Sequence, residues 1–269
     1  MGFKVSVATS AGATGFGPLM FVDNVAGAVR AAAELGYDGV EISMKNPAEL
    51  PQQELKRLLD KYGLRLAAVA SGRIFLDEKA TLSDPDKSER SRVIARVNEL
   101  VSYAGEFGAL VIVGLLRGQW PVDGDMEGSL DRFEESMRVI ADHAAANGTV
   151  VVLEAINRYE TVLLNTAEQT VEAVKKIGRP NVKVLLDVFH MNIEEVSIGD
   201  AIRATGDLLG HFHIADSNRR APGMGHVVYQ DIAKALHDIG YEGWVSAEHL
   251  PLPDDLTAAK QTRMFTRSL

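Results

Sequence analysis

Residues 149–190 read TVVVLEAINRYETVLLNTAEQTVEAVKKIGRPNVKVLLDVFH. Two apolar runs, at 149–156 and 182–188, enclose a polar turn and an amphipathic stretch that ends at Gly178. Short apolar runs rich in Val and Ile are typical of buried strands, and glycine suits the left-handed residue that ends a helix. The segment therefore predicts a strand, a helix and a second strand parallel to the first.

The same unit occurs eight times along the 269-residue chain. Its apolar runs span residues 3–9, 39–43, 64–70, 109–115, 149–156, 182–188, 209–215 and 243–248. Eight units at a spacing of roughly thirty residues favour a closed barrel over an open doubly wound sheet, whose glycine-rich dinucleotide fingerprint is missing. The glycines at Gly12, Gly15 and Gly17 indicate a loop over the barrel mouth instead. We therefore predict an α/β fold, a single (β/α)8 TIM barrel, with residues 1–269 as one catalytic domain.

Composition and charge argue against several functions. The chain carries 28 Lys and Arg against 37 Asp and Glu, a formal net charge of -9, so we expect no nucleic acid partner. It has no cysteine, which excludes disulfides, thiolate ligands and a cysteine nucleophile. No apolar run reaches the roughly 18 residues that span a bilayer, so we expect no membrane partner and a cytoplasmic location.

Four predicted strands end in residues able to do chemistry: Glu154, Asp187, His213 and Glu248. The active site of such a barrel lies at the carboxyl ends of its strands. Side chains alternate along a strand, and the neighbours of Glu154, His213 and Glu248 on the opposite parity are apolar. These three side chains are therefore expected to point into the barrel mouth.

Three carboxylates in a nearly dry mouth would repel one another by several kcal/mol unless protons or a cation compensated their charge. We therefore predict that the four residues hold one divalent metal ion. Without thiolates, the set suits Mn2+, Co2+ or Mg2+ better than a structural zinc site. The alternative for each acidic residue is a helix cap or a solvated loop group.

Other polar residues lie close to these strand ends. His190 follows Asp187 and is expected to orient the substrate or support the metal site, the alternative being a loop histidine without a task. His211, one pleat deeper than His213, is expected to be a buried hydrogen-bonded residue rather than a fifth ligand. For Glu41, near the end of the second strand, we favour a structural role.

Three stretches resemble the motifs of a known family. Residues 154–160, EAINRYE, resemble the E-x-x-N-R-[FY]-E motif of the ketose 3-epimerases, which belong to the xylose isomerase-like barrels of sugar isomerases and epimerases. Residues 186–195, LDVFHMNIEE, are similar to L-D-x-F-H-M-N-I-E-E, and residues 211–219 carry H-F-H and S-N-R. The eight-unit pattern extends the similarity over nearly the whole chain, whereas the specific motifs are confined to about residues 150–250.

The resemblance implies roles for individual residues. Four would be metal ligands, with Mn2+ as the preferred ion: Glu154, Asp187, His213 and Glu248. Two of these would double as the catalytic acid and base: Glu154 and Glu248. Three more would hold the substrate by its hydroxyl and carbonyl oxygens: Glu160, His190 and Arg219. The resemblance also implies a small-molecule sugar as substrate and a homo-oligomer, a dimer or a tetramer.

The chemistry of epimerisation agrees with these roles. Inverting the carbon next to a ketone requires removal of a weakly acidic proton and stabilisation of the resulting enediolate. A metal on the carbonyl and hydroxyl oxygens provides that stabilisation. A carboxylate on each face of the substrate can remove the proton from one side and return it from the other. We therefore predict a metal-dependent epimerase of a free ketose or a keto sugar acid.

Two arginines depart from the family members that act on neutral ketoses. Arg73 follows the third strand and Arg117 the fourth, where those members tend to have small or apolar residues. Because an arginine can pair bidentately with a carboxylate, we hypothesise that the substrate is a keto sugar acid and that Arg117 binds its carboxylate. The alternative is a salt bridge from Arg117 to Asp123, Asp125 or another loop acid.

Three other functions stay open. An aldose–ketose or hydroxypyruvate-type isomerase would use the same metal site but would move the carbonyl by one carbon. A DNA-repair endonuclease of the related barrel group would need more histidine ligands and a basic groove, which the acidic chain does not indicate. A non-catalytic metal or sugar binder would bind tightly without exchanging substrate protons.

Overall fold

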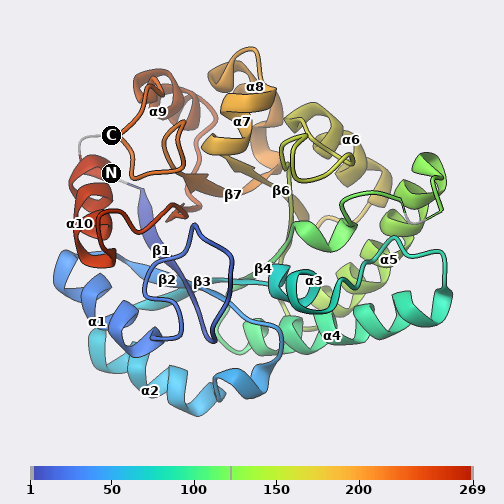
Figure 1. The fold of residues 1–269 in the computed structure, drawn as a ribbon, viewed down its shortest axis with the longest axis horizontal. Coiled ribbons are helices and arrows are strands. Elements are labelled where there is room, and N and C mark those ends of the chain that lie inside the picture. Colours follow the sequence, from blue (N-terminus) through green and yellow to red (C-terminus); the bar gives the residue numbers. More distant parts are fainter. Residues whose placement is uncertain (1–2, 122, 268–269) are drawn as a thin grey trace.

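The computed structural model describes residues 3–121 and 123–267. It contains a closed barrel of eight parallel strands in which each strand pairs with the next and the last pairs with the first (Figure 1). The strands are β1 (Lys4–Ser10), β2 (Gly39–Ser43), β3 (Arg65–Ala70), β4 (Leu110–Val113), β5 (Val151–Glu154), β6 (Val182–Asp187), β7 (Leu209–Ile214) and β8 (Trp244–Ala247). The predicted fold is confirmed, and each predicted apolar run overlaps its strand.

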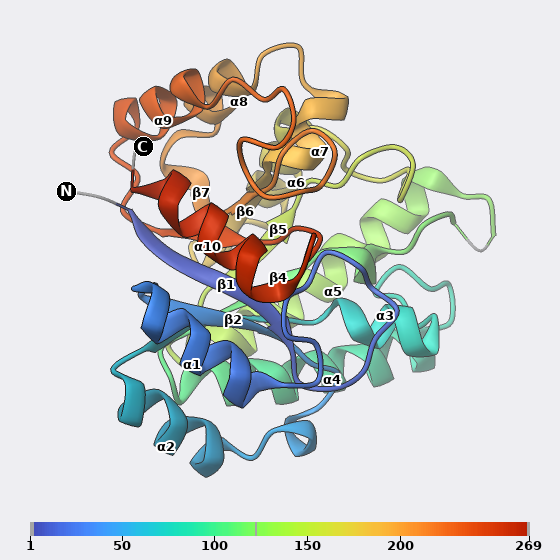
Figure 2. The ribbon, with the colours of Figure 1, turned by 60° about the vertical axis from the view of Figure 1, so that its left-hand side comes forward.

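Helices alternate with the strands and cover the outside of the barrel (Figure 1, Figure 2). They are α1 (Val25–Leu35), α2 (Gln52–Tyr62), α3 (Gly72–Glu78), α4 (Lys87–Gly105), α5 (Met126–Ala146), α6 (Ala167–Ile177), α7 (Val188–Glu194), α8 (Ile198–Thr205), α9 (Tyr229–Asp238) and α10 (Asp255–Thr266). Short 3-10 turns are η1 (Pro47–Glu49), η2 (Leu115–Arg117) and η3 (Gly206–Leu208). α10 contacts α1 and so closes the ring of helices. Within residues 3–121 and 123–267, no helix combines the length and the apolarity needed to cross a membrane.

The helix between β5 and β6 ends where its sequence predicts. α6 stops at Gly178, whose φ of 67° lies in the left-handed region that glycine adopts without strain. The Gly178 N–H donates to Val174 O. At the other end, the side chains of Thr166 and Gln169 each accept a hydrogen bond from the other residue's backbone. These two caps fix the ends of α6. After this helix the chain returns to the barrel as β6.

Alternate residues of each strand face two different cores. In β5, Val151 and Leu153 belong to the large core between barrel and helices, whereas Val152 belongs to a small apolar cluster inside the barrel. Glu154 follows Val152 by two residues and therefore points to the same inner side of the barrel. The outward residues of β7 and β8 likewise lie in the large core: Phe212, Ile214, Val245 and Ala247. The predicted alternation is therefore confirmed.

β4 is shorter than predicted. β4 ends at Val113, within the predicted apolar run at 109–115, because Gly114 turns the chain into η2. A Cβ on Gly114 would overlap the carboxylate of Glu154, so a larger residue there would displace the end of that side chain. The turn also carries Arg117 away from the strand end.

Candidate active site at the carboxyl ends of the strands

The structure brings Glu154, Asp187, His213 and Glu248, here called the quartet, together at the barrel mouth. Their candidate ligand atoms lie within 4.8 Å of one another. His213 Nδ1 is 3.6 Å from Glu248 Oε2 and 4.0 Å from Asp187 Oδ2. Four neighbouring strands, β5 to β8, supply one residue each at or just after their carboxyl ends. Barrel closure therefore produces the convergence that the parity of the strands predicts.

The surrounding protein balances the charge of the quartet only in part, through Arg219, whose Nη2 lies 2.5 Å from Glu248 Oε2 and 3.4 Å from Asp187 Oδ2. Burial, together with the charge of Glu248, raises the pKa of Glu154 to about 8. Asp187 Oδ2 and His213 Nδ1 are buried without a hydrogen-bond partner among the described residues. Buried polar atoms without partners cost free energy. Three carboxylates and one imidazole around a common point therefore fit a divalent cation that prefers oxygen and nitrogen ligands.

A second group of buried ionisable side chains lies deeper in the barrel. Glu41 of β2 lies 2.7 Å from His211 Nε2 and 3.2 Å from His213 Nε2, both hydrogen-bond distances. Although burial raises the pKa of Glu41, the charge of His213 and hydrogen bonds from both histidines hold it below its usual range. His213 thus belongs to both groups. The prediction that His211 is buried and hydrogen-bonded is confirmed.

His190 and Glu160 lie beside the quartet, on α7 and in the loop after β5. His190 Nε2 is 3.7 Å from Glu154 Oε1. Asn157 connects the two residues, since its Nδ2 lies 2.9 Å from Glu160 Oε1 and 2.6 Å from His190 Nδ1. The sequence signal for Asn157 is its place in the EAINRYE motif, which does not indicate what the side chain contacts. Its linking role emerges only from the fold.

Arg219 reaches the quartet from the loop after β7. Its guanidinium carbon lies 4.5 Å from the centre of the Phe189 ring, and its Nη2 is 2.5 Å from Glu248 Oε2. Asp216 holds this loop by accepting hydrogen bonds from three backbone N–H groups within residues 217–227. Arg219 therefore lies at the mouth, where the motif resemblance implies it, with its charge paired to a quartet carboxylate.

Arg117 does not lie where the keto-acid hypothesis requires it. Its side chain is 0% exposed, and its guanidinium donates to the backbone carbonyls of Gly114, Glu154, Leu163 and Leu164. Four of its five N–H groups thus already donate hydrogen bonds to backbone carbonyls. The physical reason is η2, which directs the side chain beneath the loop after β5 rather than into the mouth. The alternative salt bridge to Asp123 or Asp125 is not formed either, because Arg132 pairs with both.

Arg73 borders the cavity, but its charge is already paired. Its Nη1 is 2.9 Å from Glu49 Oε2, and its Nη2 is 3.5 Å from Asp77 Oδ2. Nη2 also donates to Ala13 O at 3.3 Å. Arg73 therefore ties the loop after β1 to α3, a contact that the sequence does not indicate.

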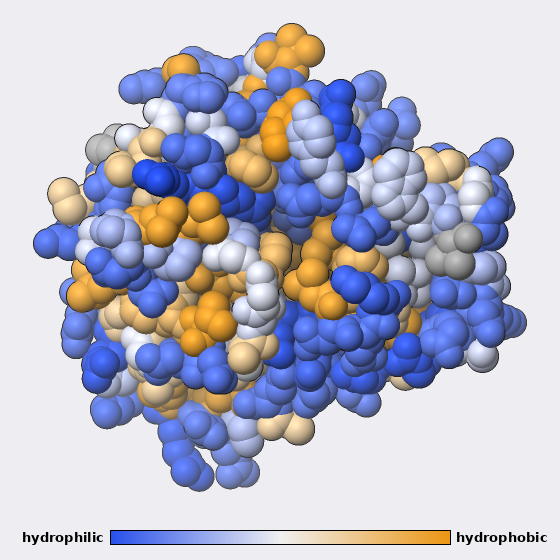
Figure 3. Space-filling model, in the orientation of Figure 1, coloured by the Kyte–Doolittle hydropathy of each residue, from blue (hydrophilic) through white to orange (hydrophobic). Residues whose placement is uncertain are grey.

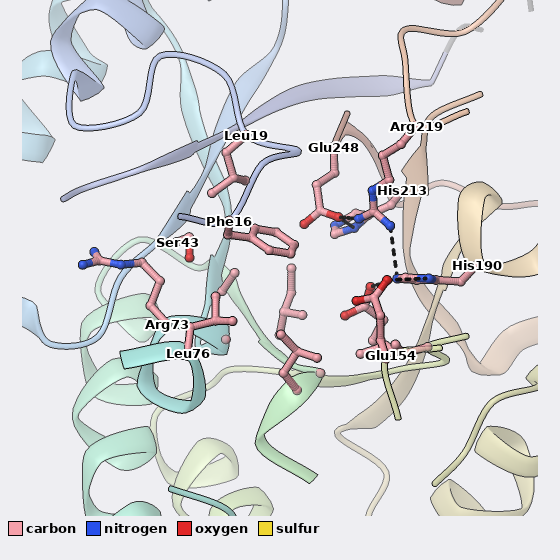
Figure 4. Close-up of a pocket in the computed structure, with 17 residues that line it drawn as sticks. Phe16, Leu19, Ser43, Arg73, Leu76, Glu154, His190, His213, Arg219 and Glu248 are labelled. Atoms are coloured by element: carbon pink, nitrogen blue, oxygen red, sulfur yellow. Dashed lines mark hydrogen bonds and ion pairs between the residues drawn. The ribbon is translucent and has the colours of Figure 1, made fainter. Parts of the chain in front are cut away.

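A cavity with an empty volume of about 530 Å³ opens at the mouth. Figure 4 shows Glu154 and Glu248 facing each other on one side of it, with Phe16, Leu19 and Leu76 on the other. Phe16 and Leu19 come from the loop between β1 and α1, which agrees with a loop over the mouth. Apolar side chains also gather near the centre of this face of the molecule (Figure 3). The cavity therefore has an ionisable end and a mainly apolar end, where Ser43 and Arg73 also line it.

The family model described as a xylose isomerase-like TIM barrel matches residues 29–269. A D-psicose 3-epimerase from Ruminiclostridium cellulolyticum is 38% identical over 227 residues, which cover 82% of this chain and 76% of that protein. A 3-dehydro-D-guloside 4-epimerase from Escherichia coli is 29% identical and covers 85% of this chain and 88% of that protein. The solved structure of a D-psicose 3-epimerase with D-tagatose from Clostridium cellulolyticum has a TM-score of 0.82 and 30% identity, over 99% of both chains.

These similarities extend over the strands that carry the quartet as well as over the barrel as a whole. The chain therefore belongs to the xylose isomerase-like TIM barrel family and is an enzyme of its sugar isomerase and epimerase group, which includes the ketose 3-epimerases.

Proposed function

We propose that the chain is a divalent-metal-dependent epimerase that inverts the carbon beside the ketone of a free, neutral ketose. The observation that carries the proposal is the quartet, in which two glutamates face each other on one side of the cavity (Figure 4). The similarity to proteins named D-psicose 3-epimerase, over about four fifths of the chain, supports this class of reaction.

Glu154, Asp187, His213 and Glu248 would hold the cation, with Mn2+ preferred over Co2+ or Mg2+. The fit rests on the donor set and on the two buried atoms without hydrogen-bond partners, Asp187 Oδ2 and His213 Nδ1. When bound, the cation would stabilise the negative charge that develops on the substrate oxygens in the enediolate.

The side chains of this chain would move the proton. One of Glu154 and Glu248 would remove it from the carbon beside the ketone, and the other would return a proton to the opposite face, which inverts the centre. Glu160, His190 and Arg219 would orient the hydroxyl and carbonyl oxygens between the two carboxylates. Asn157 would keep Glu160 and His190 in fixed relation, because it contacts both.

The charges around the cavity favour a neutral substrate over a keto sugar acid. Arg73 is paired with Glu49, and Arg219 with Glu248. Arg117 is braced on backbone carbonyls. A substrate carboxylate would therefore have to break an existing pair in order to bind a cationic side chain. Hydroxyl groups make no such demand, and the apolar end of the cavity suits the carbon chain of a small sugar.

A second candidate is a 4-epimerase of a 3-keto sugar or glycoside. The 3-dehydro-D-guloside 4-epimerase that matches 85% of the chain favours it. In both reactions the inverted carbon is next to a ketone, so the same residues would perform the same proton transfer. An aldose–ketose isomerase would share the site but shift the carbonyl.

The test is a panel of neutral ketoses, 3-keto glycosides and keto sugar acids, incubated in deuterium oxide with metal-stripped protein reloaded with Mn2+. We expect one ketose to gain a single deuterium at the inverted carbon, as seen by NMR, with the ketone unmoved. Preferred turnover of keto sugar acids would contradict the neutral-substrate assignment, and movement of the carbonyl would identify an isomerase.

A further inference from the structure

Glu41 reaches across the barrel interior to a residue of the quartet. It belongs to β2, whereas His213 belongs to β7, and β8 and β1 lie between these strands in the sheet. Both side chains are 1% exposed. Each carboxylate oxygen of Glu41 lies 3.2 Å from His213 Nε2. Burying two ionisable groups is costly unless they pair, and these two pair across the barrel.

The two ring nitrogens of His213 face in different directions. Nε2 faces Glu41, while Nδ1 faces the quartet, 3.6 Å from Glu248 Oε2, and has no hydrogen-bond partner among the described residues. A neutral imidazole carries one proton, so an acceptor at Nε2 holds the proton there and leaves the Nδ1 lone pair bare. A bare nitrogen is what a metal requires of a histidine ligand.

His211 supports Glu41 from the other side. Its Nε2 lies 2.7 Å from Glu41 Oε2, and its ring packs edge-on against the His213 ring at 5.1 Å. Glu41, His211 and His213 are themselves close enough to hold an ion. Their facing atoms, however, already make hydrogen bonds with one another, whereas the quartet contains buried atoms that lack them. The three residues are therefore better described as a hydrogen-bonded brace than as a second metal site.

We propose that Glu41 is a positioning residue, which fixes the tautomer and ring orientation of His213 and so preorganises the cation site of the proposed function. Glu41 does not touch the substrate. It acts through His213, as carboxylates commonly act on the metal-binding histidines that they contact. The inference depends on the proposed function only in requiring that the quartet binds a divalent cation.

The test compares one substitution inside the brace, E41Q, with one beside it, S246A. Glu41→Gln keeps the size of the side chain but removes the carboxylate that accepts from His213. Ser246→Ala is the matched control, because Ser246 is equally buried and lies next to His213 on the neighbouring strand, but its hydroxyl makes no hydrogen bond among the described residues. Calorimetric titration of metal-stripped protein with Mn2+ gives the affinity, and circular dichroism with thermal unfolding checks the fold.

We expect E41Q to weaken Mn2+ binding about 10- to 100-fold, and S246A to bind close to wild-type affinity. Long-range proton–nitrogen NMR of the metal-free protein gives a second measurement that does not depend on affinity. Although burial lowers the pKa of His213, the charges of Glu41 and Glu248 raise it well above its usual value, so the spectra are recorded at alkaline pH, where the ring is neutral. In wild type, His213 should carry its proton on Nε2 alone, and in E41Q on a mixture of both nitrogens. The spectrum gives the tautomer of His213 in E41Q even if this variant is less stable than wild type.

Wild-type affinity in E41Q, or equal losses in E41Q and S246A, would overturn the positioning role while leaving the proposed function standing. An unchanged His213 tautomer in E41Q would overturn it as well. Wild-type protein that binds no divalent cation would overturn the proposed function, and the positioning role with it, so the two failures are distinguishable.

Discussion

The interior of the barrel is divided into an apolar half and a polar half. The four consecutive strands β3 to β6 fill their side with Ala68, Ile112, Val152 and Leu185. The other four strands fill the opposite side with polar residues that are equally buried: Ser6, Glu41, His211 and Ser246. The two halves meet below the same mouth, yet only the apolar half gains from simple packing.

The polar half keeps atoms that the protein does not satisfy. Ser6 Oγ, Ser246 Oγ and His211 Nδ1 have no hydrogen-bond partner among the described residues. An apolar filling of the same shape would be more stable, because buried polar atoms without partners cost free energy. The polar half contains the contact between Glu41 and His213, a quartet residue, which an apolar filling could not make.

The most severe test concerns the quartet, which lies above the polar half, and uses Glu248→Gln. The amide keeps the volume of the side chain but cannot accept the substrate proton, so we expect kcat with Mn2+ to fall by about 10²- to 10⁴-fold. Deuterium exchange at the substrate carbon should fall in parallel. Exchange at the wild-type rate in this variant would remove Glu248 from the proton transfer.

The apolar half is tested by Leu185→Ala. Leu185 is 0% exposed and packs within the inner cluster, so its truncation should lower the free energy of unfolding by about 2–5 kcal/mol. Urea unfolding monitored by circular dichroism measures the change. Activity of the folded fraction should persist, and a stability loss below about 1 kcal/mol would contradict tight packing in this half.

Removal of metal tests whether the charge of the quartet is balanced by a cation. Chelation should abolish epimerisation, and Mn2+ at one hundred times its dissociation constant should add about 2.7 kcal/mol to the free energy of unfolding. Thermal unfolding of stripped and reloaded protein gives the comparison. The variant Asp187→Asn, with one charge fewer at the site, should respond less to Mn2+ than wild type does.

Arg117→Met tests a polar residue that lies on the apolar side of the mouth. The substitution leaves buried carbonyls of the β4 and β5 loops without donors, so we expect a loss of about 1–3 kcal/mol in the free energy of unfolding. The ratio of kcat/KM between neutral ketoses and keto sugar acids should not change. A selective loss of keto-acid turnover would restore Arg117 as a substrate ligand.

The smallest effect concerns the apolar end of the cavity. Phe16, Leu19 and Leu76 offer no hydrogen bond to a terminal hydroxyl. A ketose whose terminal CH2OH is replaced by CH3 should therefore keep kcat/KM within about tenfold of its parent. Loss of the hydroxyl next to the ketone should be far more damaging. A large loss on terminal deoxygenation would indicate a polar contact at this end.

The sequence by itself determined the barrel and the direction of its key side chains. Eight alternations of apolar runs and amphipathic stretches predict the strands and helices, and the period of two along β5, β7 and β8 predicts that Glu154, His213 and Glu248 point inward. The strands, the helices and the side-chain directions are local properties. Burial of one face of a strand or helix sets the pattern of apolar residues within a short stretch of sequence.

Only the tertiary structure decided which of these polar groups meet. Glu41 and His213 are brought together by the closure of the barrel, and Arg117 is turned under the next loop by a single 3-10 turn after Gly114. The ion pair between Arg73 and Glu49, which neutralises a cationic side chain beside the cavity, also joins α3 to η1. Such contacts depend on strand register, barrel curvature and loop paths, which no local pattern of residues encodes.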